Sequence, residues 1–511
     1  MKVHSMRFVG LTLYHSAQSL MFNLMRGMRR RNTGSGGIIQ LLHGRGWFVM
    51  ALVIGAGLLN LPTPEGLTDQ GYAVLVMSIV ATILFVTEPI PLPAVALLII
   101  VTEVVLLGVN PNDAAKSIMS DSVLFIMGSL MLAVSIVKQK LDKRIAFFIV
   151  KMTGTNTANI CVGITIVSGF MASVIGEHTV AAMMLPVAIT LIRLTSEDPK
   201  EVRRLAAALL FSISCGCAIA GISTPSGGAR NAIMIGFWSE FYYDPLNPDT
   251  FKYLIDYVSW ALYCFPIFLV QLPLTSYIIL KVFPPEYNSL NRAVVKLRAQ
   301  LAEQGKMDVG DWSTIAILFI TLVGWITMSG TIGLGIIALL GAIAFLVVGL
   351  VKWDDINTNV NWGVVLLYGA AISLGVQMKD TGAAIWLADK FITLLSNIGA
   401  ESGVGLWLSV SALTTAVTNM MSNGAAVAML GPVALKMAAV SGESPLLMGY
   451  ITAISSSFAY LTVVGTPACT IVYASGYLKA SDFLAVGWRM LIMSTTVLML
   501  FAYFYWPVLG L

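Results

Sequence analysis

Apolar runs of about the length needed to cross a lipid bilayer recur along the whole chain. A helix needs roughly 20 apolar residues to span a hydrocarbon layer of about 30 Å. The runs predict eleven transmembrane helices, near residues 47–61, 71–88, 92–108, 122–138, 205–222, 257–281, 313–329, 332–351, 363–378, 447–464 and 483–507. Because 57% of the residues are apolar and only 11% are charged, we expect a polytopic all-α membrane protein in contact with lipid, with no nucleic-acid partner.

Two further apolar stretches do not fit simple spans, because polar or small residues interrupt each near its centre. Residues 158–192 are interrupted at Gly176-Glu177-His178, and residues 404–438 at Ser422-Asn423-Gly424. We interpret both stretches as re-entrant helical hairpins, which enter the membrane and return.

Two helices are also predicted to be broken. The sequence "STPSGG" at 223–228 interrupts 205–240, and "GTPAC" at 465–469 interrupts 447–475, since glycine and proline disfavour a continuous helix. Non-helical backbone at membrane depth survives only inside protein or beside a water-filled cavity. The hairpin tips and the breaks therefore mark a functional site.

The distribution of basic residues predicts the orientation, because Lys and Arg in short loops stay on the cytoplasmic side. With the amino terminus inside, 23 of the 30 basic residues fall in cytoplasmic segments, and the carboxyl terminus lies outside. Residues 1–46 carry seven basic residues and no acidic one, which fits an amphipathic helix, a transit peptide or a positive-inside anchor. We favour the anchor, and interpret 282–312 as a cytoplasmic linker between the halves 47–281 and 313–511.

The two halves repeat each other weakly. "GEHTVAAMMLPVA" begins at Gly176 and "SNGAAVAMLGPVA" at Ser422, and Thr224-Pro225 corresponds to Thr466-Pro467 at a similar offset. Two halves of opposite topology, each with a hairpin tip and a broken helix, are typical of secondary transporters with the site at the repeat interface. The alternative is that the small residues only allow close helix packing.

Glu177 and His178 are unusual at membrane depth, where an ionisable side chain is costly and is a functional candidate by default. The other three histidines all lie within the first 43 residues. Arg230, just after the first break, is the expected partner of Glu177. Three interpretations stay open: Glu177 carries a proton in each cycle, it forms a fixed ion pair with Arg230, or it only caps the second hairpin helix.

The chain resembles the divalent anion:sodium symporter family, from residue 45 to the end. The resemblance rests on "PTPEGLTDQGYAVLVMSIVATILFVTEPIPLPAVALL" near the start, on the two hairpin tips and on the two Thr-Pro turns. That family has Ser-Asn-Thr at each tip; here the second tip keeps Ser422 and Asn423 but has Gly424, and the first tip matches nowhere. The resemblance implies a homodimer with a scaffold domain and a transport domain that moves like an elevator.

The resemblance also implies site residues. Thr418 and Asn423, with backbone near Gly465, would form a sodium site in the second half, whereas the corresponding first-half positions are Ala172 and Glu177. We expect coupling to involve Glu177, Arg230, Thr418, Asn423 and Gly465. We expect the substrate to contact the tips and turns, namely Glu177, His178, Thr224, Pro225, Ser422, Asn423, Gly424, Thr466 and Pro467.

The expected function is secondary active transport of a small divalent or polyvalent organic anion, such as succinate, malate or citrate, across the inner (plasma) membrane. Coupling to Na+, to H+ or to a counter-anion stays open, and no cofactor is expected. The alternatives are a carrier of sulfate or another inorganic anion, and an anion channel. We do not expect an enzyme, because the zinc pattern His-Glu-x-x-His and a nucleophilic serine elbow are missing.

Overall fold

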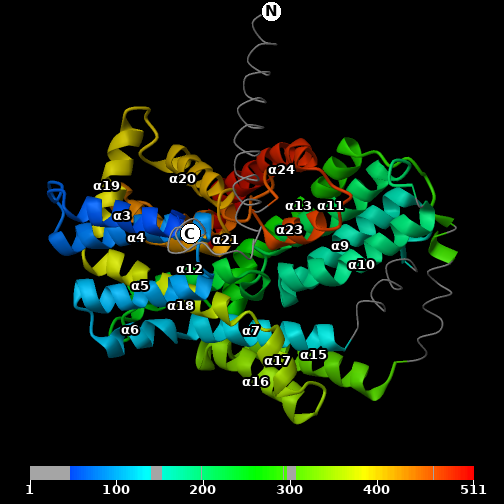
Figure 1. The fold of residues 1–511 in the computed structure, drawn as a ribbon, viewed down its shortest axis with the longest axis horizontal. Coiled ribbons are helices and arrows are strands. Elements are labelled where there is room, and N and C mark those ends of the chain that lie inside the picture. The colour runs from blue at the N-terminus through cyan, green and yellow to red at the C-terminus, as the bar shows by residue number, and fades with distance from the viewer. Residues whose placement is uncertain (1–45, 140–151, 197, 292, 296–306, 464) are drawn as a thin grey trace, which may run out of the picture.

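The computed structural model describes residues 46–139, 152–196, 198–291, 293–295, 307–463 and 465–511. In these ranges the fold is helical with no strand, and ten helices are long and apolar enough to cross a membrane (Figure 1). The expected all-α polytopic fold is confirmed. The basic amino-terminal segment, up to residue 45, and residues 292 and 296–306 of the linker lie outside the described residues.

The first half contains the expected apolar helices in order. They and their connecting helices are α3 (Gly46–Leu59), α4 (Asp69–Thr87), α5 (Leu92–Leu107), α6 (Pro111–Ile118), α7 (Asp121–Lys138), α9 (Thr157–Ile175), α10 (Glu177–Thr195), α11 (Arg203–Ala220), η1 (Pro225–Gly227), α12 (Ala229–Tyr242), η2 (Pro248–Tyr253) and α13 (Tyr257–Val282).

The second half likewise contains apolar helices, a hairpin and a broken helix. Its elements are α15 (Val309–Ile332), α16 (Leu334–Val347), α17 (Trp353–Asn359), α18 (Trp362–Asp380), α19 (Ala383–Ser396), α20 (Gly403–Thr418), α21 (Asn423–Ser441), α22 (Pro445–Ser455), α23 (Pro467–Tyr473), α24 (Ala480–Leu500), η3 (Phe501–Tyr505) and η4 (Trp506–Leu509). Helix α19 falls on no predicted span.

Both interrupted apolar stretches are helical hairpins. Gly176 alone joins α9 to α10, and its φ of 87° is a conformation that residues with a side chain rarely adopt. Residues 419–422 join α20 to α21, and the Ser422 hydroxyl caps α21 by accepting from the Ala425 amide at 3.3 Å. Three of the four hairpin helices are among the ten candidate spans, so their return within the membrane stays a prediction.

The second break is longer than predicted. The span expected over 447–464 ends as a helix at Ser455, and the described residues between there and α23 are not helical. Asn419, directly after α20, holds this segment: its amide donates to Phe458 O at 3.1 Å and its oxygen accepts from Leu461 N at 2.9 Å. These bonds satisfy buried backbone groups that would otherwise favour continuing the helix.

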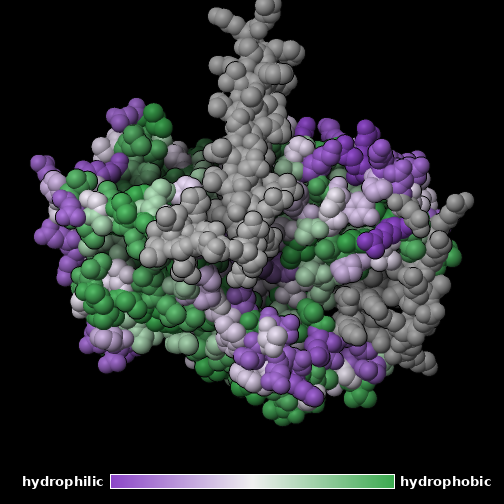
Figure 2. Space-filling view, in the orientation of Figure 1, coloured by the Kyte–Doolittle hydropathy of each residue, from purple (hydrophilic) through white to green (hydrophobic). Residues whose placement is uncertain are grey.

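The two breaks lie in the interior of the molecule. Helix α11, which leads into the first break, is 89% buried over its apolar window, whereas α15 is only 17% buried. Helix α11 packs against α9, α10, α13 and α23, and α18 packs against α5, α12 and α21. Broad apolar areas over α3, α4 and α5 are visible in Figure 2. The exposed leucine and valine side chains of α5, such as Leu97 and Val105, are suited to contact lipid.

Candidate substrate and cation site

The two hairpin tips meet at the first break. Glu177 is the first residue of α10, Arg230 is the second residue of α12, and Asn423 is the first residue of α21. Arg230 Nη1 donates to Glu177 Oε1 at 3.1 Å, and the Asn423 amide nitrogen lies 3.3 Å from the same oxygen. Side chains from both halves therefore form one cluster, as the repeat predicted.

The ion pair between Glu177 and Arg230 is almost completely buried. Their side chains are 4% and 1% exposed. The amino ends of α10, α12 and α21 lie beside the carboxylate, and the partial positive charge of helix amino ends stabilises an anion. Removing one partner of a buried pair leaves an uncompensated charge, at a cost of about 3–5 kcal/mol.

The Arg230 guanidinium is held by neighbours that the sequence did not indicate. Its Nη2 donates to the Ser457 hydroxyl at 3.1 Å, and that hydroxyl donates to Ala218 O at 2.7 Å. A Cβ atom at Gly221 would lie 2.3 Å from Nη2, and one at Gly228 would lie 2.8 Å from Nη1. The missing side chains of these two glycines therefore make room for the guanidinium.

The second half brings a set of oxygens together. The Thr418 hydroxyl donates to Ser456 O at 2.6 Å and lies 3.0 Å from the nearer end of the Asn423 amide. That end of the amide also lies 3.0 Å from Gly465 O and 3.1 Å from Ser456 O. Carbonyls of unwound helix and hydroxyl oxygens are the groups with which transporters hold Na+.

In the described part of the first half, an amide side chain occupies the carbonyls of the break. The Asn231 amide donates to Gly221 O at 2.8 Å and to Thr224 O at 2.7 Å, and so uses the carbonyls of the first break. At the position equivalent to Thr418 stands Ala172, which has no hydroxyl. The asymmetry between the two halves that the sequence suggested is therefore present in the geometry.

The two threonines of the Thr-Pro turns act as helix caps. The Thr224 hydroxyl donates to Ser173 O and accepts from Gly227 N at 3.2 Å, and the Thr466 hydroxyl accepts from Cys469 N at 3.1 Å. Pro225 and Pro467 each occupy the first position of the helix that follows. These four residues shape the breaks, and Thr224 has no hydrogen left for a substrate.

His178 differs from its neighbours in being exposed, although Glu177 beside it is buried. Ser422 at the other tip, and Gly228 and Ala229 at the first break, are partly exposed. The solvent-accessible part of the cluster therefore presents an imidazole and helix amino ends, both of which suit an anion.

Gly424 is covered by Tyr368 of α18, which explains why this tip carries no larger residue. A Cβ atom at Gly424 would lie 2.3 Å from a ring carbon and 2.5 Å from the hydroxyl of Tyr368. Gly424→Ala should thus destabilise the protein by about 1–3 kcal/mol through overpacking, measured as a lower apparent melting temperature.

The matched control for Gly424→Ala is the same change in a Tyr368→Ala background. There the added methyl group has space, so it should cost less than about 0.5 kcal/mol. Equal effects of Gly424→Ala in both backgrounds would show that Tyr368 does not set the size limit at this tip.

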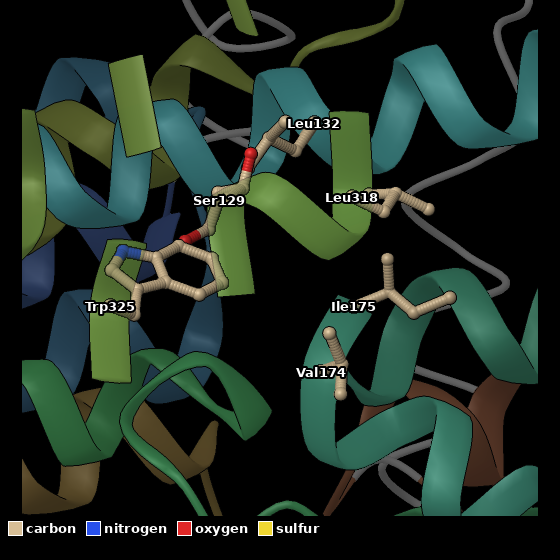
Figure 3. A pocket seen from close by; sticks show the side chains of 7 residues that line it. Ser129, Leu132, Val174, Ile175, Leu318 and Trp325 are labelled. Atoms are coloured by element: carbon tan, nitrogen blue, oxygen red, sulfur yellow. The ribbon is translucent and has the colours of Figure 1, made fainter. Parts of the chain in front are cut away.

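The first hairpin tip also borders helices α7 and α15. Val174 and Ile175 at the end of α9 face a narrow space whose other side is formed by Leu318 and Trp325 of α15 and by Leu132 of α7 (Figure 3). This border is mostly apolar, and it carries no salt bridge among the described residues.

Comparisons with solved structures show the fold. A transporter of Alcanivorax borkumensis, YdaH, matches with a TM-score of 0.55 at 15% identity, covering 91% of this chain and 99% of the other. MtrF of Neisseria gonorrhoeae matches with a TM-score of 0.50 at 12% identity, covering 93% and 97%. A membrane fold of two repeated halves, with hairpin tips and broken helices around a buried polar cluster, is that of a secondary transporter.

The chain belongs to the family described as the sodium:sulfate symporter transmembrane region, whose model matches residues 46–511. It is 24% identical to the sodium-dependent dicarboxylate transporter SdcS of Staphylococcus saprophyticus, covering 97% of this chain and 96% of that protein. It is 27% identical to an uncharacterized transporter of Haemophilus influenzae, covering 90% and 96%. The family resemblance seen in the sequence is confirmed.

Four residues of the site were missed by the sequence analysis: Asn231, Asn419, Ser457 and Tyr368. Asn231 follows Arg230 at the start of a mostly apolar helix, and Asn419 lies between two apolar helices. A polar residue beside apolar membrane helices needs a hydrogen-bond partner. Both asparagines could therefore have been predicted as site residues from the sequence. Ser457 and Tyr368 gave none, because each lies inside a predicted span, where a single serine or tyrosine does not stand out.

Proposed function

We propose that this protein is a secondary active transporter that carries a small dicarboxylate across the membrane together with Na+. The observation that carries the proposal is the buried cluster in which Glu177, Arg230 and Asn423 meet beside the oxygens of the second break. The substrate class comes from relatives named sodium-dependent dicarboxylate transporters. The cluster itself contributes an anion-binding face and a cation-binding face.

The cation face consists of Thr418, Asn423 and the backbone oxygens of Ser456 and Gly465. Four oxygens close to one another repel unless a hydrogen or a cation lies between them. The set fits Na+, because all its ligands are neutral oxygens and two are carbonyls of unwound helix.

The anion face consists of His178, Ser422 and the amino ends of α10, α12 and α21. The substrate carboxylates accept from the imidazole, from the Ser422 hydroxyl and from backbone amides. Glu177 is neutralised by Arg230 in the fixed pair, so that its charge does not repel the substrate. Of the three interpretations of Glu177, the geometry favours this one.

The protein moves its site by an elevator motion and works as a homodimer in the plasma membrane, with the amino terminus inside. The hairpins and α11, α12, α13, α22, α23 and α24 form the moving part, and α3 to α7 with α15 to α18 form the scaffold. The apolar border at Val174, Ile175 and Trp325 supports this division (Figure 3). No chemical transformation of the substrate is required.

The test is uptake of labelled succinate into proteoliposomes, with Na+ and proton gradients imposed separately. We expect an inward Na+ gradient to drive uptake and a proton gradient to have no effect, since Glu177 is held by Arg230. Unlabelled succinate on the far side should accelerate exchange, which a channel would not show. Because the described residues offer Na+ the oxygen set of the second break, uptake should rise hyperbolically with Na+ concentration.

Sulfate is the second candidate substrate. The family model is described by sodium:sulfate symport, and Gly424 and His178 stand where hydroxyl residues would serve a carboxylate. Sulfate should therefore be tested as a competitor of succinate uptake, with citrate and malate beside it. If a Na+ gradient drives uptake of none of these anions, the proposed function is wrong.

A further inference from the structure

Tyr257, the first residue of α13, contacts α15 of the scaffold in two ways. Its ring stacks on the Trp325 ring, with centroids 5.4 Å apart and an interplanar angle of 6°. Its backbone amide donates to the Ser329 hydroxyl at 3.2 Å. Trp325 lies at the narrow space between the first hairpin and the scaffold (Figure 3). These two interactions, here called the boundary contact, join the moving part to the scaffold.

The boundary contact is shielded from solvent. Tyr257, Trp325 and Ser329 are 3%, 2% and 7% exposed. The first amides of a helix have no partner inside it, so the Tyr257 amide depends on the Ser329 hydroxyl for its hydrogen bond. A buried donor that loses its acceptor is costly. Separating α13 from α15 therefore removes a stacked aromatic pair and a buried hydrogen bond together.

The Tyr257 hydroxyl connects the boundary contact to the first break. It lies 3.0 Å from the Ser226 hydroxyl of η1, which donates to Ser173 O of α9 at 3.2 Å. A Cβ atom at Gly176, the tip of the first hairpin, would lie 3.7 Å from Ser226 O. Residues of the hairpin tip and the break thus fix the tyrosine ring. A ring that is already fixed loses little freedom when it stacks on Trp325.

A second polar contact between the two parts is exposed. Lys379 Nζ of α18 donates to Glu240 O of α12 at 2.6 Å, and it lies 5.4 Å from the centroid of the Phe241 ring. Water replaces an exposed hydrogen bond when that bond breaks, so its net contribution is small. The buried boundary contact therefore opposes separation of the two parts more strongly than Lys379 does.

We propose that Tyr257 is a positioning residue that holds the moving part in the position seen in this structure, through its stack on Trp325 and its bond to Ser329. The proposal rests on the proposed function, and it names a contact that opens when the moving part changes position. An aromatic pair and a hydrogen bond each change an equilibrium by about 3-fold to 10-fold. Removing either one should lower the ratio of this position to the other by that factor.

The test measures how often the full-length protein in nanodiscs occupies this position. Spin labels are attached to Leu246→Cys, between α12 and η2 of the moving part, and to Val105→Cys, on α5 of the scaffold. Double electron–electron resonance then reports the distances between the two labels. Both side chains are well exposed, at 90% and 72%, whereas the five native cysteines are buried. We expect two separations, one of which matches the structure.

Four variants address the boundary contact. Tyr257→Leu and Trp325→Leu should each lower the ratio by about 3-fold to 10-fold, and the double variant should lower it no further in the aromatic term, because both changes remove the same stack. Ser329→Ala alters no ring and guards against misfolding of the leucine variants; it should lower the ratio by about threefold. Tyr257→Phe keeps the ring and should change the ratio by less than about twofold.

The matched control is Phe125→Leu. Phe125 of α7 also contacts the Trp325 ring, with centroids 5.5 Å apart, but both residues belong to the scaffold. The change should lower the apparent melting temperature about as much as Tyr257→Leu does, yet leave the ratio within about twofold of the wild-type value. Lys379→Met, at the exposed contact, should also leave the ratio within about twofold.

The outcomes are distinct. If Tyr257→Leu and Ser329→Ala change the ratio no more than Phe125→Leu does, the boundary contact does not hold the moving part. The inference then fails, while Na+-driven uptake of succinate still supports the proposed function. A single separation with and without Na+ and succinate would overturn the inference too, and would remove the elevator motion from the proposed function. Transport itself is contradicted only by the absence of Na+-driven uptake.

Discussion

Glu177→Gln alone and Arg230→Met alone should each destabilise the folded protein by about 3–5 kcal/mol and reduce succinate uptake by at least about 100-fold. Each change leaves one charge buried without its partner, at a position where the pair is at most 4% exposed. The measurements are the amount of folded protein, its apparent melting temperature, and uptake per folded molecule.

The double variant Glu177→Gln with Arg230→Met should recover most of the lost stability, because replacing both members of a buried pair is close to neutral. Exchanging the two charges should recover less, since Gly221 and Gly228 leave space for a guanidinium only where Arg230 now lies. Arg203→Ala is the matched control. Its pair with Asp482 spans 3.5 Å with the arginine half exposed, and should contribute less than about 1 kcal/mol.

If the double variant is no more stable than either single variant, the two residues do not act as a pair. Glu177 would then have a separate role. A pH response of uptake that is lost in Glu177→Gln would identify that role as proton transfer.

Asn423→Ala should abolish Na+-driven uptake while the protein still inserts and folds. It removes a ligand from the oxygen set of the second break and a neighbour of Glu177 and Arg230 in one step. Thr466→Ala should have a much smaller effect. It removes a helix cap at Cys469 N, with an expected cost of about 1 kcal/mol.

Uptake at increasing Na+ concentration distinguishes these two variants. Asn423→Ala should stay inactive at every Na+ concentration, whereas Thr466→Ala should approach wild-type uptake at saturation. Thr466→Ser keeps the capping oxygen and serves as its control. Wild-type uptake by Asn423→Ala would contradict the assignment of the cation face. Loss of uptake in both Thr466 variants would show that the turn at Thr466 takes a direct part in transport.

The two breaks show which helix ends the sequence predicts and which it does not. Gly176 predicted where α9 stops and Pro467 predicted where α23 begins, because their backbone preferences act locally. The end of α22 at Ser455 was not predictable, since the backbone after it is held by Asn419 from the preceding hairpin. That contact joins residues about 40 positions apart, and only the packing of the hairpin brings them together.

The sequence by itself determined that this chain is an all-helical membrane protein with a repeated hairpin and break, because apolar length and helix-breaking residues act within a few turns of the chain. The tertiary structure decided how the site is built. It placed Asn423 between the oxygens at Ser456 and Gly465 and the pair of Glu177 with Arg230 that the sequence had suggested, and it used Asn231 to fill the first break. The physical reason is that each contact joins different helices, so it depends on how those helices pack, which no local pattern specifies.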